Sequence, residues 1–485
     1  MKMAKSFGFG FWLLTLFVAQ AQLHQEVFEE KTVRYTGGPY LNESFGYRLM
    51  RPAKEERGKS YPLVVFLHGA GERGTDNRRQ LRYLPEKLAT PEAREAYPCF
   101  LIAPQCRPEK KWVDAPWEAP QSLPMKRNPS DQLQVAIEAI RETVQGYPVD
   151  RQRIYLTGLS MGGYGAWELG MRFPEWFAAL GPVCGGGDER VVHRLADLPI
   201  WTFHGGADPV VPVGRSRTLV ERLKLLGRNP RYTEIKDGGH RAWDAAYGNG
   251  GMVPWLFEQK RPPGVSIGNL DALFSPSTPL KAGDRIVVLG DSLTQFADGP
   301  KGFLSLLRAG SRQRPDLSLD WINAGVSGNK VPDLMKRLQR DVLDRTPTVV
   351  VVFIGINDVW HHREGRGTSK AAFEVGLTDV ITRLQSTPAS LILVTPPLIG
   401  EKRTGNRMDS MLEAYASISR KVAAKAGITV CDLRQSMSAY LEVFNRGDAE
   451  KGILTSDGVH LSEAGNRMVA NRMAGSLIEA LQKRR

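Results

Sequence analysis

The feature that most constrains this sequence is the regular alternation of short apolar runs with segments of helical periodicity. Six such runs between residues 61 and 237 have the length and the β-branched and aromatic content of buried parallel strands. Between two of these runs, apolar residues recur at helical spacing, at Leu133, Ile137, Ile140 and Val144. Strands that alternate with helices in this way predict an α/β sheet covered by helical layers.

A second series of apolar runs follows a stretch of different composition. Residues 260–284 are rich in proline, glycine and serine and lose the helical periodicity, which is typical of a boundary between domains. Beyond it, runs that begin at Arg285, Thr348, Leu391 and Ile428 again have the character of buried strands. A chain of 485 residues is also too long for one hydrophobic core, since such cores rarely exceed about 250–300 residues. The sequence therefore predicts two α/β domains of different layout.

The N-terminus has the three parts of a secretory signal peptide. Lys2 and Lys5 precede the apolar run from 7 to 18, and small residues follow at Ala19 and Ala21. This run is shorter than the roughly 20 residues that span a membrane, so a cleaved leader is favoured over stable membrane insertion. We therefore expect a secreted or periplasmic protein. The predicted segments are a signal peptide at 1–21, a first domain at 22–262, a linker at 263–283 and a second domain at 284–485.

The chain carries an excess of basic residues, with a formal net charge of +13. Blocks of lysine and arginine are absent apart from short pairs, which argues against a nucleic-acid partner. Attraction to an acidic polysaccharide or to an anionic envelope is compatible with the excess, and so is solubility alone.

Export would permit disulfide bonds among the four cysteines, Cys99, Cys106, Cys184 and Cys431. Cys99 and Cys106 flank an expected strand, and seven residues at about 3.3 Å each separate them by roughly 23 Å, beyond disulfide reach. The sequence leaves a disulfide between Cys106 and Cys184 open.

A serine nucleophile is indicated by the motif GLSMG in the first half. Ser160 lies between two glycines, after an apolar run and before a helical segment, as in the sharp strand–turn–helix elbow that exposes a catalytic serine. Because a serine needs a base and a carboxylate that orients this base, the candidate partners are His240 and Asp208, each of which follows an expected strand. The backbone N–H of Met161 would donate to the oxyanion.

Small residues at Gly69 and Ala70 follow another expected strand and would let backbone N–H groups approach a developing oxyanion. With the segments HGAGERG, GLSMGGYG, ADPVVPV and GGHRAW, the first half resembles the α/β-hydrolase superfamily. Within it, the resemblance is to secreted esterases similar to polyhydroxybutyrate depolymerases and feruloyl esterases. This resemblance implies Ser160 as the nucleophile, His240 as the base and Asp208 as the residue that orients the base.

A second serine, Ser292, lies in the motif GDSLTQ directly after an apolar run. Far downstream, Asp457 and His460 are three residues apart, so one short turn can present both to the same hydroxyl. Together with NAGVSGN and GINDVW, which contain Gly328 and Asn357, these segments resemble the four blocks of the SGNH (GDSL) hydrolases. The resemblance implies a flavodoxin-like α/β/α sandwich in which Ser292 is the nucleophile, His460 the base and Asp457 its partner. It also implies an oxyanion hole formed by the backbone N–H groups of Ser292 and Gly328 and the side-chain amide of Asn357.

Three tryptophans are candidates for contact with a substrate ring. Trp112 and Trp117 fall in a loop after an expected strand, at the edge of the sheet where α/β proteins bind ligands. Trp360 follows Asn357 closely. Each ring could stack on a sugar or a phenolic group, and simple packing within the loop is the alternative.

Both candidate sites predict a covalent acyl-enzyme that forms by serine attack and is released by water, without a metal or an organic cofactor. We therefore expect a bimodular serine esterase whose substrate is an ester. The resemblance implies acetyl or feruloyl groups on a polysaccharide or its oligosaccharides. A lipid or polyester esterase is one alternative, and a single catalytic domain fused to a degenerate domain that only binds is another.

Overall fold

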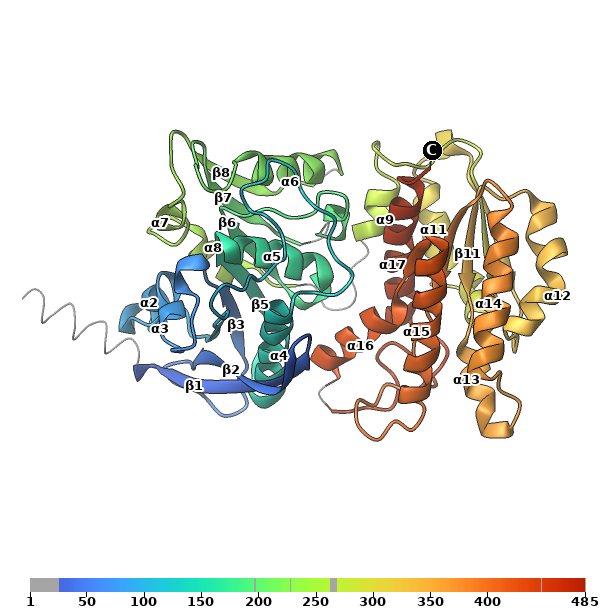
Figure 1. Ribbon diagram of the computed structural model, residues 1–485, viewed down its shortest axis with the longest axis horizontal. Helices are drawn as coiled ribbons and strands as arrows, with labels where there is room; N and C mark the ends of the chain where they lie inside the picture. Colours follow the sequence, from blue (N-terminus) through green and yellow to red (C-terminus); the bar gives the residue numbers. More distant parts are fainter. Residues whose placement is uncertain (1–25, 196–197, 227, 262–267, 446, 485) are drawn as a thin grey trace, which may run out of the picture. The chain divides into compact units, whose positions relative to one another are not determined.

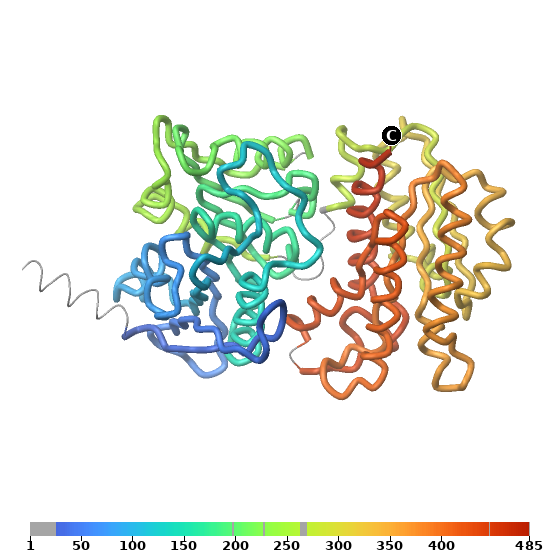
Figure 2. The backbone as a smooth tube through the Cα atoms, in the orientation of Figure 1, coloured from blue at the N-terminus to red at the C-terminus, as the bar shows by residue number. Residues whose placement is uncertain are grey.

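The computed structural model describes residues 26–195, 198–226, 228–261, 268–445 and 447–484 (Figure 1). The predicted signal peptide at 1–21 lies outside these residues. The chain divides into two compact units between residues 262 and 263. Two short segments of the first half are grouped with the second unit. Strands alternate with helices along both units, which confirms the predicted α/β class. Figure 2 traces the path of the backbone through these elements.

One mixed sheet organises the first unit. Within the described residues it has eight strands, in the order β1-β2-β4-β3-β5-β6-β7-β8. β2 pairs antiparallel with both β1 and β4, whereas the strands from β4 to β8 pair in parallel. The bounds are β1 (Phe28–Gly37), β2 (Tyr40–Met50), β3 (Tyr61–Leu67), β4 (Phe100–Pro104), β5 (Val149–Leu159), β6 (Ala179–Val183), β7 (Trp201–Gly205) and β8 (Arg231–Ile235).

The six predicted strands of the first half correspond to β3 through β8, but β1 and β2 were not predicted. β1 is the edge strand of the sheet and β2 is its neighbour, and only some of the side chains in these two strands are covered. In β1, for example, Phe28 and Val33 are buried while charged residues between and around them remain partly exposed. A mixed pattern of this kind is usual for edge strands and lacks the continuous apolar run of a buried one.

Helices cover both faces of this sheet. Phe66 of β3 shares a buried cluster with Leu84 and Met252, so α2 and α8 lie over one face. A Cβ atom added at Gly165 of α5 would lie 2.8 Å from Cδ1 of Leu67, which points to the opposite face because side chains alternate along a strand. The bounds are α2 (Leu84–Leu88), α3 (Pro91–Ala96), α4 (Asp131–Gly146), α5 (Met161–Arg172), α6 (Gly214–Leu225), α7 (Trp243–Ala246) and α8 (Met252–Glu258).

The helix that the sequence predicts around residues 133–144 is α4. It begins where the Ser130 hydroxyl accepts a hydrogen bond from the Leu133 backbone N–H at 3.1 Å, which is the usual capping arrangement. Leu133, Ile137 and Ile140 are fully buried, as the spacing of these residues predicts.

The second unit contains a parallel sheet with the strand order β10-β9-β11-β12-β13. Numbered within the unit, this order is 2-1-3-4-5, which is that of flavodoxin-like folds. The bounds are β9 (Arg285–Gly290), β10 (Asp320–Gly325), β11 (Val349–Phe353), β12 (Ser390–Val394) and β13 (Thr429–Cys431). β10 was not predicted as a strand, because most of its residues are polar or small and only half-buried at the sheet edge.

Two helical layers accompany this sheet (Figure 1). α11 contacts α17, whereas α12 contacts α14 and α14 contacts α15. The bounds are α10 (Ser292–Gln295), α11 (Phe303–Ser311), α12 (Val331–Asp341), α13 (Ile356–Trp360), α14 (Lys370–Gln385), α15 (Asp409–Ala426), α16 (Leu433–Phe444) and α17 (Glu463–Leu481). None of the helices in the described part of the chain combines the length and the apolar character needed to cross a membrane.

Part of the predicted linker at 263–283 is folded. A short helix, α9 (Gly268–Leu273), lies inside this segment, and it packs against α17. Leu270, Leu273 and Phe274 are buried in the hydrophobic core of the second unit. Two turns of helix are too short for a recognisable periodicity among the surrounding prolines and serines, which explains why the sequence suggested a linker.

All four cysteines are buried and free. The disulfide between Cys106 and Cys184 that the sequence left open is therefore not formed. Burial raises the pKa of both thiols to about 12, so they remain protonated and unreactive near neutral pH.

Candidate active sites

Ser160 occupies a sharp turn between β5 and α5. Its φ of 52° and ψ of −118° lie in a region that residues with a side chain rarely adopt. A Cβ atom at Gly162 would lie 1.9 Å from the Leu67 carbonyl oxygen, and one at Gly158 would lie 2.4 Å from the Gly162 carbonyl oxygen. Only glycine therefore fits on either side of Ser160, and the elbow exposes the serine at the carboxyl end of β5.

The structure brings the three predicted residues of the first triad into one hydrogen-bonded row. Nε2 of His240 lies 2.8 Å from Oγ of Ser160, and Nδ1 of His240 lies 2.7 Å from Oδ2 of Asp208. Because a carboxylate accepts, Nδ1 carries the proton and Nε2 is free to accept the serine proton. Trp243 packs its ring edge-on against the His240 imidazole at 5.2 Å, which restricts the rotation of the imidazole.

The side chain of Asp208 is fully buried and strongly hydrogen-bonded. Its Oδ1 accepts from the backbone N–H groups of Val210 and Val211 at 2.9 and 3.0 Å. Burial alone would raise the pKa of Asp208, but the hydrogen bonds from His204, His240 and these two amides outweigh it and hold the pKa well below its ordinary value. The carboxylate therefore stays ionised and can stabilise the imidazolium that forms during catalysis.

Two further residues support Asp208 and were not predicted from the sequence. His204 at the end of β7 is fully buried, with Nε2 3.0 Å from the Val211 carbonyl oxygen and 3.4 Å from Oδ2 of Asp208. The second residue is Cys184, whose Sγ lies 3.2 Å from the His240 carbonyl oxygen. Ligand atoms of Cys184, His204 and Asp208 lie within 4.8 Å of one another, as in some metal sites. Their polar atoms already hydrogen-bond to the triad and its loop, so we assign this cluster to positioning Asp208.

Three residues predicted for the first oxyanion hole lie at helix starts. Met161 is the first residue of α5, and Ala70 is the first residue of the 3₁₀ turn η1 (Ala70–Glu72). Backbone N–H groups at the first turn of a helix have no partner within the helix, so they remain available to an oxyanion. Gly69 precedes η1, and its carbonyl oxygen accepts a hydrogen bond from the Glu72 N–H at 3.3 Å.

The prediction that Trp112 contacts the substrate is wrong. Its ring is fully buried, and its Nε1 donates to the carbonyl oxygen of His68 at 3.0 Å. A Cβ atom at Gly165 would lie 2.9 Å from Cβ of Trp112, so this tryptophan packs beneath α5 as part of the core. Trp117 is half-buried instead, with Lys111 Nζ 4.3 Å from its ring centre, and its carbonyl oxygen accepts from the hydroxyl of Tyr164 at 2.9 Å.

The second triad also forms one row. Nε2 of His460 lies 3.2 Å from Oγ of Ser292, and Nδ1 of His460 lies 2.7 Å from Oδ2 of Asp457. Asp457 Oδ1 accepts from the backbone N–H groups of Val459 and His460, which closes the turn that holds both residues. Burial would raise the pKa of Asp457, but hydrogen bonds from the His460 side chain and from these two amides outweigh it and lower the pKa to about 2.

The residues predicted for the second oxyanion hole lie on three loops after strands. Ser292 is the first residue of α10 and Asn357 lies in the first turn of α13, and both are almost fully buried. The Asn357 amide donates one hydrogen to the Asn329 carbonyl oxygen at 3.1 Å, which orients the amide and leaves its second hydrogen for an oxyanion. Gly328, next to Asn329, has a φ of 78°, which favours glycine.

Two buried carboxyl groups adjoin these catalytic residues. Asp291 precedes Ser292 and accepts from the Leu293 N–H at 3.0 Å, and Asp358 follows Asn357 and accepts from the Val331 N–H. Burial raises the pKa of Asp291 to about 7. The negative charge of Asp358 adds to this increase, and the hydrogen bond from the Leu293 N–H opposes it. Burial likewise raises the pKa of Asp358 to about 6.

Glu401 is the main positioning residue of the second site that the sequence did not reveal. It is buried at 1% exposure, and its Oε1 accepts from the Leu454 N–H and from the backbone and hydroxyl of Thr455. Its Oε2 accepts from the Ile453 N–H at 2.9 Å. These bonds hold the segment that leads into Asp457 and His460. Glu401 lies more than fifty residues upstream in a loop, and no spacing rule connects it with that segment.

The predicted substrate contact Trp360 lies at the C-terminal end of α13 and is half-buried. Arg363 covers its ring at 4.9 Å, and the ring also packs against the hydrophobic core of the second unit. His362, which follows closely, hydrogen-bonds to Thr368 and Tyr415 within the same unit. The contacts of Trp360 with a substrate remain a prediction.

Comparison with known families assigns each half of the chain separately. Residues 53–247 match the phospholipase/carboxylesterase family, and residues 288–468 match the GDSL-like lipase/acylhydrolase family. Each matched range lies within one half of the chain and contains all three residues of the corresponding row.

Similar proteins cover about two fifths to one half of the chain. An acetylxylan esterase of Geobacillus stearothermophilus is 26% identical over 209 residues, which are 39% of this chain and 91% of that protein. Among solved structures, a thermostable esterase is 42% identical with a TM-score of 0.44, over 49% of this chain and 64% of the esterase. An acetyl xylan esterase is 38% identical with a TM-score of 0.38, over 39% of this chain and 97% of that structure.

Proposed function

We propose that the chain is a carboxylic ester hydrolase with two active sites, since one part of it matches the phospholipase/carboxylesterase family and another part matches the GDSL-like lipase/acylhydrolase family. The observation that carries the proposal is the presence of a serine–histidine–aspartate row in each unit. The Oγ–Nε2 distances of 2.8 and 3.2 Å suit proton transfer from serine to histidine in both rows.

The same sequence of steps applies to each site. The histidine Nε2 takes the serine proton while Oγ attacks the ester carbonyl carbon, and the carbonyl oxygen becomes an oxyanion held by the N–H donors. Collapse of this intermediate breaks the bond to the alcohol, which leaves with the proton from Nε2. A water molecule then attacks the acyl-enzyme and gives one proton to Nε2. The carboxylic acid departs as Oγ recovers that proton.

We propose that the substrates are acyl groups on a polysaccharide. The acetylxylan esterases among the similar proteins support this choice, although they resemble only part of the chain. The second site should favour small acyl groups such as acetyl. The first site has the half-buried Trp117 nearby and should accept bulkier or aromatic acyl groups such as feruloyl.

The test uses the full chain and three variants, Ser160→Ala, Ser292→Ala and the double variant. Substrates are p-nitrophenyl acetate, a long-chain p-nitrophenyl ester, acetylated xylan and feruloylated xylan. Each single variant should retain one activity profile, and the double variant should lose several orders of magnitude on every ester. A single variant as inactive as the double one would show that the other domain is not catalytic. Release from the long-chain ester but from neither xylan would favour a lipid or polyester substrate.

We also propose that the chain is exported through its N-terminal segment. Expression of the full chain in a bacterial host, followed by fractionation and sequencing of the mature N-terminus, tests this proposal. Export predicts a mature chain that begins at Gln22. Recovery of an uncleaved chain in the cytosol would contradict it.

A further inference from the structure

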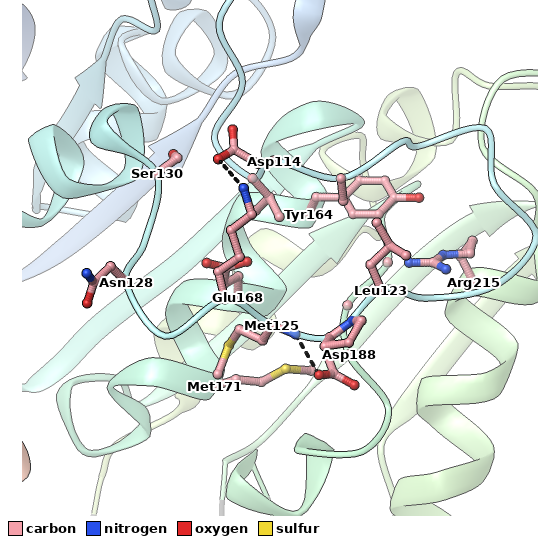
Figure 3. Close-up of a pocket in the computed structure, with 16 residues that line it drawn as sticks. Asp114, Leu123, Met125, Asn128, Ser130, Tyr164, Glu168, Met171, Asp188 and Arg215 are labelled. Carbon is pink, nitrogen blue, oxygen red and sulfur yellow. Dashed lines mark hydrogen bonds and ion pairs between the residues drawn. The ribbon is translucent and has the colours of Figure 1, made fainter. Parts of the chain in front are cut away.

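A small pocket with a cavity volume of about 40 Å³ lies in the first unit, and loops that follow four different strands contribute to it (Figure 3). The loop after β4 supplies Leu123, α5 supplies Tyr164 and Glu168, the segment after β6 supplies Asp188, and α6 supplies Arg215. All of these segments lie at the carboxyl ends of parallel strands. This is the edge at which α/β proteins bind their ligands.

Arg215 is the unusual member of this lining. The residue is only 5% exposed, and neither its Nε nor its Nη1 has a hydrogen-bond partner among the described residues. Its guanidinium lies over the Tyr164 ring at 5.6 Å, and in Figure 3 it points from α6 toward Leu123 and Tyr164. A buried cation with two nitrogens that lack acceptors is costly, because these nitrogens have lost water without gaining a hydrogen bond. Such a group is stabilised when an anion enters the pocket.

The acidic side chains of the lining are already engaged with other cations. Glu168 pairs with Arg172 at 2.6 Å, and Asp188 pairs with Arg190 at 2.7 Å. Asp114 pairs with Lys126 at 3.1 Å, as the dashed line in Figure 3 marks. Among the described residues, no carboxylate forms an ion pair with Arg215. The pocket thus presents one positive charge that lacks a carboxylate partner and lies next to apolar side chains.

Helix α5 connects the pocket with the first nucleophile, because Tyr164 lines the pocket and Ser160 directly precedes the helix. Tyr164 lies one helical turn after Ser160, and its N–H donates to the Ser160 carbonyl oxygen at 3.2 Å. Four residues at 1.5 Å per residue separate the two along the α5 axis by about 6 Å, which is the scale of one substituent on an ester. Ser216, next to Arg215, donates to the Gly185 carbonyl oxygen at 3.1 Å and thereby fixes the start of α6 against the segment that follows β6.

We propose that this pocket binds a carboxylate carried by the ester substrate of the first site and that Arg215 is its counter-ion. The inference rests on the proposed esterase function of Ser160 and narrows its substrate class to anionic esters. The carboxylate belongs either to the acyl group, as in a half-ester of a dicarboxylic acid, or to the alcohol, as in an acidic sugar. A guanidinium suits both, because it binds carboxylates through two parallel hydrogen bonds. The net charge of +13 would favour the approach of an acidic polymer as well.

The experiment uses the full chain with Ser292→Ala, so that only the first site is measured. One substrate pair places the carboxylate on the acyl side. Its members are the mono-p-nitrophenyl ester of adipic acid, which is anionic, and the p-nitrophenyl ester of adipamic acid, which is neutral. The other pair places it on the alcohol side: 4-acetoxybenzoate and 4-acetoxybenzamide. For each pair, the ratio of kcat/KM for the anionic ester to that for the neutral ester is the quantity compared between variants.

Arg215→Met should lower this ratio by about 10- to 100-fold in at least one pair, which is the range expected for a hydrogen bond to a charged group. Arg215→Lys should restore part of it. The matched control is Arg217→Met, which removes the same charge from the same helix, where Arg217 pairs with Glu234 on the surface. This control should leave both ratios unchanged. The pair that responds identifies which side of the ester carries the carboxylate.

A second measurement needs no change at Arg215. Free adipate or 4-hydroxybenzoate should inhibit the Ser292→Ala protein competitively, at least about 10-fold more strongly than the neutral adipamide or 4-hydroxybenzamide. Equal inhibition within both pairs, or ratios that Arg215→Met and Arg217→Met change alike, would overturn the proposal. Loss of hydrolysis of p-nitrophenyl acetate by the Ser292→Ala protein would instead refute the proposed function of the first site.

Discussion

Replacement of Glu401 by glutamine tests how the second site is held together. The carboxylate accepts four hydrogen bonds from the segment 453–455, just before Asp457 and His460. In Glu401→Gln, the amide oxygen can keep the three donors at Oε1, but the new NH₂ group faces the Ile453 N–H, so that two donors oppose each other. One hydrogen bond to a charged group, worth about 1.5–3 kcal/mol, is lost, and the other three weaken with the charge.

We therefore expect the free energy of unfolding of the second unit to fall by about 2–4 kcal/mol. The segment leads directly into the turn that holds Asp457 and His460, so the His460 imidazole should also lose its alignment with Ser292. In the structure, Nε2 of His460 lies 3.2 Å from Oγ of Ser292. A misplacement of about 1 Å can cost up to about 10²-fold in rate. The expected result is a kcat reduced by about 10- to 100-fold with little change in KM.

The assay is the hydrolysis of p-nitrophenyl acetate by the full chain with Ser160→Ala, together with thermal melts followed by circular dichroism. Glu450→Gln is the matched control, because this glutamate is exposed in the same region of the chain. The first site offers an internal control, since Glu401→Gln combined with Ser292→Ala should keep its activity. An unchanged kcat together with an unchanged melting temperature would refute the assignment of Glu401 as a positioning residue.

Four further predictions address the two sites and the cores around them. Asn357→Ala, made with Ser160→Ala, should lower kcat by about 10²–10³-fold with little change in KM, as for the loss of one oxyanion-hole donor; a shift in the melting temperature alone would make Asn357 structural. Trp112→Ala should destabilise the first unit by about 3–5 kcal/mol in denaturant melts, whereas Trp117→Ala should alter only the kinetics on bulky esters. Because the pKa of Asp291 is raised to about 7, the folded state keeps a proton that the unfolded chain loses near pH 4, and stability should fall as the pH rises from about 4 to 7. Asp291→Asn should remove much of this decrease in stability, as measured by thermal melts at pH 5 and pH 8, and Asp358 accounts for the remainder. A steeper decrease in the variant would contradict the assignment. Since the four cysteines are free and buried, a reductant should leave the melting temperature unchanged, and a decrease would reveal a disulfide.

Local motifs were the part of the architecture that could be predicted from the sequence. The elbow around Ser160 requires glycine neighbours for steric reasons, so its sequence reveals its geometry. Asp457 and His460 share one turn, and their spacing alone brings them together. The buried strands have continuous apolar runs, which made most of both sheets predictable.

What could not be predicted depends on contacts between segments distant in the chain or on the direction of a side chain. Glu401 and His204 act through partners that no motif connects with them, so nothing local distinguishes them from ordinary polar residues. Trp112 lies in a loop at the expected edge of the sheet, but a loop position does not say whether a ring points outward or into the core. The strands β1 and β2 were missed because only part of their surface is buried, so neither has a continuous apolar run.

The two catalytic rows differ in how much chain lies between their members, and this has a consequence for when each becomes functional. Ser160 and His240 are 80 residues apart, whereas Ser292 and His460 are 168 residues apart. At about 5–20 residues per second, a ribosome would add the second base roughly 8–35 s after the second serine, against about 4–16 s for the first pair. During that interval the second serine has no group to accept its proton and is inert toward esters. The first row, in contrast, has all its members before Ser292 has been translated. If both proposed sites are active, each nascent chain acquires its activities in two stages, and a chain interrupted between residues 262 and 457 would be a monofunctional hydrolase.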